Sequence, residues 1–172
     1  HNKLVFAESD CWDMAVDRSL AVKGIMMSAR IPDKGENVVN IDILTPMLWE
    51  VVEEYDGTKL FHRPKAYKEM KARVAEQCLA LAETVNPGLG EMRLKTWSST
   101  PLTYKDYNLT PEGSAFCFRK DFSNPMMTIA SPKTQIPNLF MTGQSLMLHG
   151  LHGVTMTAAY TCQEINMNTI SE

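Results

Sequence analysis

Two histidines near the end of the chain have the clearest capacity for chemistry. His149 and His152 stand three residues apart. Histidine titrates near neutral pH, so both are candidates for proton transfer in catalysis. They could also share a metal, but a metal needs further ligands, and no nearby Cys, Asp or Glu has suitable spacing. We therefore predict no metal site, and the alternative role for either histidine is packing or hydrogen bonding.

The glycines around these histidines predict a backbone site for a planar or anionic group. We expect a short strand at Leu139–Thr142, then Gly143-Gln144, a loop with Gly150 and Gly153, and a helix over Val154–Ile170. The first N–H groups of a helix lack partners and carry partial positive charge. Glycine also lets a ligand approach the backbone closely. This geometry suits the N1–C2=O edge of a reduced flavin, although any strand-to-helix turn shares it.

Two other motifs are incomplete, and a third is a chance match. Gly143-Gln144-Ser145-Leu146-Met147 begins like a nucleophile elbow, but Met147 replaces the second glycine. Gly88-Leu89-Gly90-Glu91-Met92-Arg93 begins like a dinucleotide fingerprint, but it leads out of a helix and Arg93 replaces the third glycine. Asn108-Leu109-Thr110 matches a glycosylation sequon, a chance match where no secretory signal pattern is seen. We therefore expect neither a serine hydrolase nor a phosphate-cradling βαβ unit.

The preceding part of the chain predicts a sheet covered by a helix. A short helix around 10–20 is followed by two strand-like runs, 23–31 and 38–44, and their turn-rich connector indicates an antiparallel hairpin. The strongest predicted helix spans 64–85. Its start is indicated by Pro64, since proline suits a first helical position. Its apolar face, which we expect to pack on the hairpin, consists of Tyr67, Met70, Val74, Cys78, Leu81 and Val85.

The remaining elements are shorter. Residues 91–98 are expected to form a strand, and Thr100 is expected to cap a helix that runs to Tyr107. Residues 108–137 predict ordered loop, because they combine turn formers with large apolar side chains that avoid water. The predicted fold class is α+β: a mixed or antiparallel sheet with packed helices, followed by a C-terminal strand, loop and helix.

Composition excludes several classes of function. The chain has 172 residues and a net charge of −3, which argues against a nucleic-acid partner. No apolar run approaches the roughly 18 residues needed to cross a bilayer. The chain begins with His1 rather than Met, which suggests a piece of a longer protein. The cysteines are far apart and are expected to be buried thiols: Cys11, Cys78, Cys117 and Cys162.

Four motifs occur in a fixed order along the second half of the chain. They are Thr100-Pro101-Leu102-Thr103-Tyr104, Thr110-Pro111-Glu112-Gly113-Ser114, Ile136-Pro137-Asn138-Leu139-Phe140-Met141-Thr142-Gly143-Gln144 and His149-Gly150-Leu151-His152-Gly153-Val154. Together they resemble the C-terminal part of the phytoene desaturase, carotenoid isomerase and retinol saturase-like flavoproteins, which are amine-oxidase-type FAD enzymes. The resemblance is dense over 95–166 and looser over 10–95.

The resemblance implies a discontinuous FAD-binding domain. Residues 1–130 would be the C-terminal portion of the substrate-binding domain, and 131–172 would be the flavin-closing segment. The Gly143-Gln144 peptide would lie by the ribityl or pyrophosphate group, although many members place an acid where this chain has Gln144. The backbone N–H groups of 153–155 would point at the flavin. The implied cofactor-binding residues are Gly143, Gln144, Gly150, Gly153, Val154 and Thr155.

The resemblance also implies what the parent protein does. It would be an FAD-dependent oxidoreductase that desaturates, saturates or isomerises a lipophilic polyene or isoprenoid-like substrate by hydride exchange with the flavin, with NAD(P) as a further redox cofactor. Peripheral membrane contact, and a cytoplasmic or membrane-peripheral rather than secreted location, are expected of the parent.

The 172-residue chain by itself is expected to be inactive, because it lacks the G-x-G-x-x-G unit that holds the ADP half of FAD in this family. We also expect it to form a homodimer, since its C-terminal strand and helix would have lost the sheet that they pack against. The alternative is a stand-alone, non-catalytic binding module that holds an apolar ligand or a protein partner.

Overall fold

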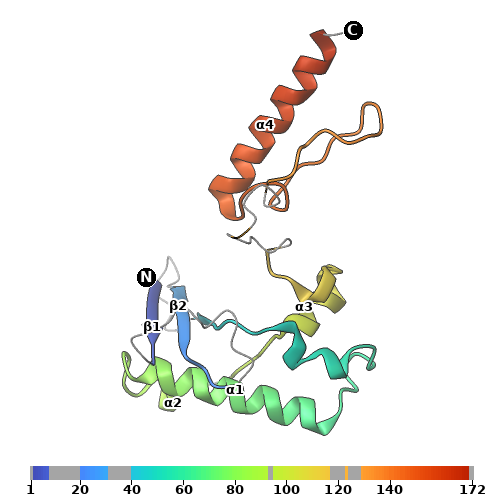
Figure 1. Ribbon diagram of the computed structural model, residues 1–172. Helices are drawn as coiled ribbons and strands as arrows, with labels where there is room; N and C mark the ends of the chain where they lie inside the picture. Colours follow the sequence, from blue (N-terminus) through green and yellow to red (C-terminus); the bar gives the residue numbers. More distant parts are fainter. Residues whose placement is uncertain are drawn as a thin grey trace. The chain divides into compact units, whose positions relative to one another are not determined.

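The computed structural model describes residues 2–7, 20–30, 40–92, 95–116, 123 and 129–170. For 168–170 it describes the backbone alone. The chain divides into two compact units, His1–Gly113 (unit 1) and Ser114–Glu172 (unit 2), shown in Figure 1. Each unit is described by itself. The predicted α+β class is confirmed, because unit 1 combines a small antiparallel sheet with several helices.

The sheet of unit 1 has three antiparallel strands in the order β1-β2-β3. They are β1 (Asn2–Phe6), β2 (Gly24–Arg30) and β3 (Asn40–Leu44). The predicted hairpin of β2 and β3 is confirmed, with Met27 opposite Ile43. The sequence did not predict β1, because its apolar residues are consecutive, Leu4-Val5-Phe6, and do not alternate. Only Val5 of these is buried, and it pairs with Ile25.

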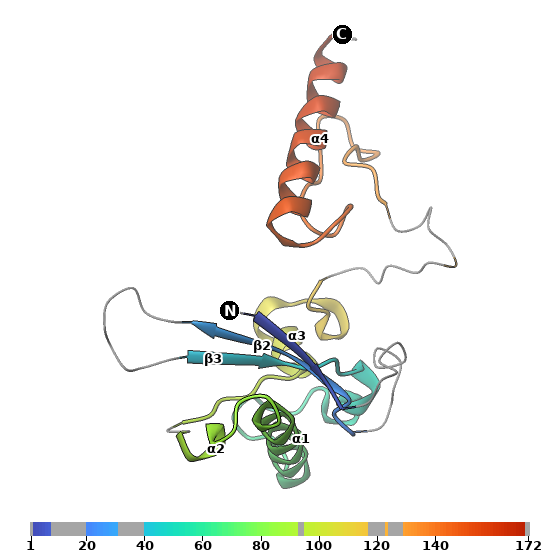
Figure 2. The same ribbon diagram turned by 90° about the vertical axis from the view of Figure 1, so that its left-hand side faces the viewer.

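Helix α1 (Lys65–Glu83) covers one face of this sheet (Figure 2), as predicted. Pro64 precedes it as the N-cap rather than taking the first helical position. The predicted face is confirmed except at its end, where Ala82 is buried, Leu81 is half-buried and Val85 is 40% exposed beyond the helix. This face shares the core of unit 1 with Val5, Ile25 and Met27 of the sheet: Tyr67, Met70, Val74, Cys78 and Ala82.

Burial has a chemical consequence for Cys78. Desolvation raises the pKa of this thiol to about 11, so Cys78 stays protonated and unreactive near neutral pH. The expectation of a buried thiol is confirmed here and wrong at Cys162, which is exposed. Cys11, Cys117 and the helix expected around 10–20 lie outside the described residues.

The connection from β3 to α1 contains two 3-10 helices, η2 (Trp49–Val51) and η3 (Glu53–Tyr55). Arg63, just before α1, pairs with Asp106 of α3 (Pro101–Asn108), and Lys105 of α3 pairs with Asp56. The Lys105 ammonium lowers the pKa of Asp56 below its ordinary value. These two ion pairs fasten α3 to the loop that leads into α1.

The cap of α3 is confirmed. The backbone N–H of Thr100 donates to Oγ1 of Thr103 over 3.2 Å. The Thr100 hydroxyl also lies 2.8 Å from the hydroxyl of Tyr67 in α1, and Leu102 is completely buried in the shared core. The strand predicted over 91–98 is wrong. A short helix, α2 (Leu89–Met92), occupies its start, and 95–98 is irregular.

Unit 1 ends in a tight 3-10 turn, η4 (Pro111–Gly113). Gly113 has φ +62°, and a Cβ placed on it would lie 1.7 Å from the carbonyl oxygen of Pro101. Gly57 has a similar φ of +72° but nothing within 4 Å. Alanine at position 57 would therefore suffer backbone strain alone, whereas alanine at position 113 would also overlap Pro101.

Substituting both glycines with alanine tests this difference. We expect Gly57→Ala to lower the free energy of unfolding by about 1 kcal/mol, the cost of a left-handed alanine. Gly113→Ala should cost about 3 kcal/mol or more, since overlap with Pro101 adds to that strain. Urea unfolding followed by circular dichroism measures both, and equal losses would contradict the packing of η4 on α3.

Among its described residues, unit 2 has a mostly irregular segment, 129–149, called the arm, and one helix, α4 (Gly150–Ile170). The helix begins four residues before the predicted start at Val154. The strand predicted over 139–142 is wrong, because an isolated bridge between Lys133 and Phe140 is the β pairing that the structure describes there. Among the described residues no helix is both long and apolar enough to cross a membrane.

The buried stripe of α4 also differs from the prediction, which had Val154, Ala158, Thr161, Cys162 and Ile165 on one face. Thr161 is buried as predicted, but Gly153 and Thr157 complete the buried stripe, while Val154 is half-buried and Ala158, Cys162 and Ile165 are exposed. The stripe is made of small residues because the arm lies close against the helix backbone. The Thr161 hydroxyl reaches the Met141 carbonyl at 3.2 Å.

Candidate functional site

The residues implied as cofactor-binding all lie between Gly143 and Thr155 of unit 2. Gly143 has φ +107° and opens a turn that the Leu146 N–H closes on the Gly143 carbonyl at 3.3 Å. Gly150, the first residue of α4, has φ +78°. A Cβ on either glycine would meet no other atom within 4 Å. The backbone at both ends of this loop is therefore open to a close neighbour.

Gly153 has a different role from these two glycines. It is buried, and a Cβ on it would lie 2.4 Å from the Leu148 carbonyl oxygen. Its own carbonyl accepts a hydrogen bond from Oγ1 of Thr157 over 2.9 Å. Gly153 thus lets the loop fold onto the first turn of α4, and this close approach fixes the shape of the segment.

The early start of α4 changes which N–H groups are available to a ligand. The first four N–H groups of an α-helix have no partner within it. Because α4 starts at Gly150, they belong to 149–152 rather than to the predicted 153–155. Val154 is half-buried and Thr155 is exposed, and Oγ1 of Thr155 donates to the Leu151 carbonyl one turn earlier. The two sets share no residue.

The two histidines flank the start of α4, and both are exposed. The ring of His149 stacks on Phe116, with centroids 4.3 Å apart and planes at 29°. Gln144 is half-buried in the turn after Gly143. Within the described ranges, no three His, Cys, Asp or Glu side chains are placed to hold a metal.

The sheet of unit 1 presents an apolar row that the sequence did not predict. Leu4, Met26 and Leu44 lie opposite one another on the three strands, and they are 68%, 41% and 45% exposed. Phe6 continues this surface and is 43% exposed. The signal for this row in the sequence was adjacent apolar residues within a strand, such as Met26-Met27 of β2, because they make both faces of the strand apolar. An apolar row of this kind is typical of a contact with a lipophilic ligand or another protein surface.

Two curated proteins are similar to this chain, and both are named all-trans-retinol 13,14-reductase. The protein from Danio rerio is 26% identical over 140 residues, which cover 80% of this chain and 23% of that protein. The protein from Macaca fascicularis is 26% identical over 119 residues, which cover 67% of this chain and 20% of that protein. The chain thus spans less than a quarter of the length of these relatives.

No protein-family model and no solved structure matches the chain. The relationship of this chain to known proteins rests on two observations: the similarity to two reductases and the motifs of the second half of the chain. Both support a relationship to oxidoreductases of the retinol saturase-like kind.

Proposed function

We propose that the chain is the C-terminal part of an FAD-dependent oxidoreductase that acts on a carbon–carbon double bond of a retinoid or isoprenoid-like lipid. The similarity to all-trans-retinol 13,14-reductases over 80% of the chain carries this proposal. Saturation is the direction that the relatives' names favour. Desaturation and isomerisation are the other reactions of the flavoproteins that the motifs resemble.

The loop from Gly143 to Gly153 fits a flavin in two respects. Gly143 and Gly150 leave open space beside the backbone, as a planar ring system requires. The N–H groups of 149–152, which have no partner within α4, offer partial positive charge to an anionic oxygen. A bound flavin would supply hydride exchange at its N5 atom, with NAD(P) as the proposed source of reducing equivalents.

His149 and His152 are the side chains that we propose for proton transfer, because saturation of a double bond needs a proton beside the hydride. His149 is held by its stack on Phe116, while His152 lies on the first turn of α4. The apolar row Leu4, Met26 and Leu44 is the proposed contact for the lipid chain of the substrate.

The test uses the longer reading frame that includes the sequence upstream of this chain. We expect the purified protein to show flavin absorbance at about one flavin per chain and to convert all-trans-retinol anaerobically, in the presence of reductant, to a product with two more hydrogens. The 172-residue chain alone should be colourless and inactive. A helix N-terminus contributes only about 1 kcal/mol to anion binding.

Gly153→Ala in the longer protein tests the loop proposed for flavin, because the added methyl would overlap the Leu148 carbonyl and change the shape of the loop. We expect it to lose bound flavin, while Gly57→Ala in unit 1 keeps it. A longer protein that binds retinol without flavin and without changing it would contradict the proposal and support the binding module.

A further inference from the structure

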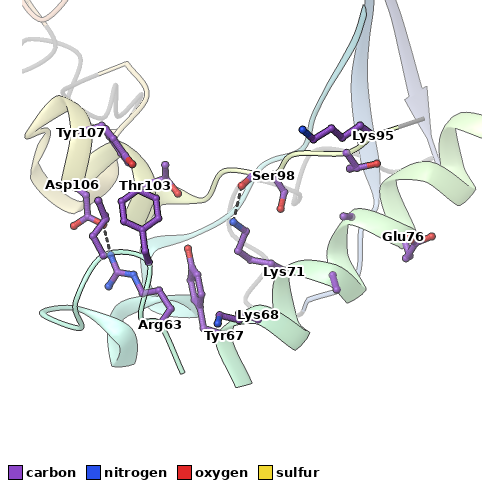
Figure 3. Close-up of a pocket in the computed structure, with 15 residues that line it drawn as sticks. Arg63, Tyr67, Lys68, Lys71, Glu76, Lys95, Ser98, Thr103, Asp106 and Tyr107 are labelled. Carbon is purple, nitrogen blue, oxygen red and sulfur yellow. Dashed lines mark hydrogen bonds and ion pairs between the residues drawn. The ribbon is translucent and has the colours of Figure 1, made fainter. Parts of the chain in front are cut away.

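A pocket of about 700 Å³ lies in unit 1 between α1, α3 and the segments that precede them (Figure 3). Its walls come from 60–63, the 67–76 part of α1, 95–98 and 103–107. None of these residues belongs to the loop proposed for flavin, and all lie in unit 1. A ligand of this pocket can therefore be tested whether or not the flavin proposal holds.

Three lysines give the pocket its positive charge. Lys68 and Lys71 lie on α1, and Lys95 lies on the segment that runs alongside this helix (Figure 3). Across the part of the chain that the structure describes, none of the three is paired with a carboxylate. Nζ of Lys71 donates to the Ser98 carbonyl over 2.6 Å, which fixes the ammonium at the pocket and leaves further N–H donors for a ligand.

The other charged side chains of the pocket do not cancel these lysines. Arg63 and Asp106 form an ion pair with each other, and Arg63 also donates to the Tyr55 and Thr58 carbonyls. Glu76 is the remaining carboxylate. Four basic and two acidic side chains line the pocket, a net charge of +2 in a chain whose net charge is −3. Such a local excess of positive charge favours an anion.

The uncharged part of the lining combines apolar and aromatic side chains with the hydroxyls of Thr96, Ser98 and Thr103. Ala72 and Ala75 of α1 contribute small apolar surfaces, and Phe61 and Tyr107 are 80% and 60% exposed. Phe61 has φ +63°, a left-handed backbone that is rare for a bulky residue. Strained backbone of this kind concentrates at functional positions. Here the strain and an exposed phenyl ring occur together at one pocket.

We propose that this pocket binds a small amphipathic anion, with a carboxylate or phosphate head group and an apolar chain or ring. Lys68, Lys71 and Lys95 contact the head group through charge-assisted hydrogen bonds. Phe61 and Tyr107 pack against the apolar part. Neither a bare anion nor a neutral apolar molecule satisfies both halves of this lining.

The experiment uses the full chain and a fluorescent fatty acid, dansyl-labelled undecanoate, as the probe. Displacement by four unlabelled competitors identifies the ligand chemistry: decanoate, decyl phosphate, decanol and inorganic phosphate. We expect decanoate or decyl phosphate to displace the probe roughly tenfold more effectively than decanol, because decanol lacks the charge-assisted hydrogen bonds. The stronger of the two anions identifies the head group. Inorganic phosphate should displace little.

Variants locate the probe, since other exposed apolar surfaces could bind it. Lys71→Gln and Lys68→Gln should each weaken binding roughly tenfold. Lys68 is exposed and forms no ion pair among the described residues, so its variant should fold normally. Arg73→Gln removes the same charge from α1 outside the pocket and should change affinity less than twofold, a small surface-charge effect.

Phe61→Asn distinguishes an effect on binding from an effect on folding. Asparagine tolerates a positive φ better than phenylalanine does, so the unfolding midpoint should stay equal or rise while affinity for the probe falls. Unchanged affinity in both Lys68→Gln and Phe61→Asn would overturn the proposal. So would equal displacement by decanol and decanoate, or a loss in Arg73→Gln as large as that in Lys68→Gln.

Discussion

Replacing Leu102 with alanine should lower the free energy of unfolding of unit 1 by about 3 kcal/mol, within the range for buried leucines. Leu102 is completely buried where α3 joins the core of α1 and the sheet. The truncation leaves a cavity that Val52, also fully buried, has little room to fill. Urea unfolding followed by circular dichroism gives the value.

Leu109→Ala is the matched control, because Leu109 ends the same helix and is 84% exposed. Its expected cost is below about 0.5 kcal/mol. If the two substitutions cost the same, α3 would not pack on the core as described.

The purified chain should self-associate at low micromolar concentration, with light scattering giving twice the mass of one chain. Unit 2 buries one large aliphatic side chain among its described residues, Leu146. A soluble monomer rarely leaves so many large apolar side chains in water around so small a core. Ten large apolar side chains of this unit are at least 40% exposed: Phe116, Ile129, Ile136, Leu139, Met141, Leu148, Leu151, Met156, Ile165 and Met167.

Two variants test whether α4 forms the interface. Leu151→Glu and Met156→Glu should each weaken dimerisation tenfold or more, since burying an unpaired carboxylate costs well over about 1.4 kcal/mol. Leu109→Glu in unit 1, which is 84% exposed, should leave it unchanged. Alkylation of the exposed Cys162 should slow as the dimer forms. A monomeric mass at all concentrations with fast alkylation of Cys162 would contradict the prediction.

The sequence predicted those elements whose periodicity follows one buried face. The row from Tyr67 to Cys78 predicted α1, because each of these side chains contacts the same core. Thr100 and Pro101 predicted the start of α3, since capping depends on local residues alone. Ile41 and Ile43 predicted β3, because apolar residues two apart lie on the same face of a strand.

Strand β1 and the buried face of α4 escaped prediction, for different reasons. β1 has Leu4, Val5 and Phe6 in succession, so no alternation reveals it. The buried face of α4 consists of small residues fitted to the arm, such as Gly153 and Thr157, which hydrophobic periodicity does not register.

The pocket of unit 1 was hidden for a further reason. Its lysines, Lys68, Lys71 and Lys95, come from two segments that only the fold brings together. The loop from Gly143 to Thr155 was found from its motif, and its role stays a prediction.

The position of α1 in the chain sets an order of events during synthesis. Strands β1, β2 and β3 leave the ribosome before the helix that covers them, because α1 ends at Glu83 while β3 ends at Leu44. Until then Val5, Ile25 and Met27 have no helix to pack against. Bringing the sheet and α1 together requires closing a long loop of chain, which is slow compared with forming α1 itself. The nascent sheet is therefore the stage at which a chaperone would protect this chain from aggregation.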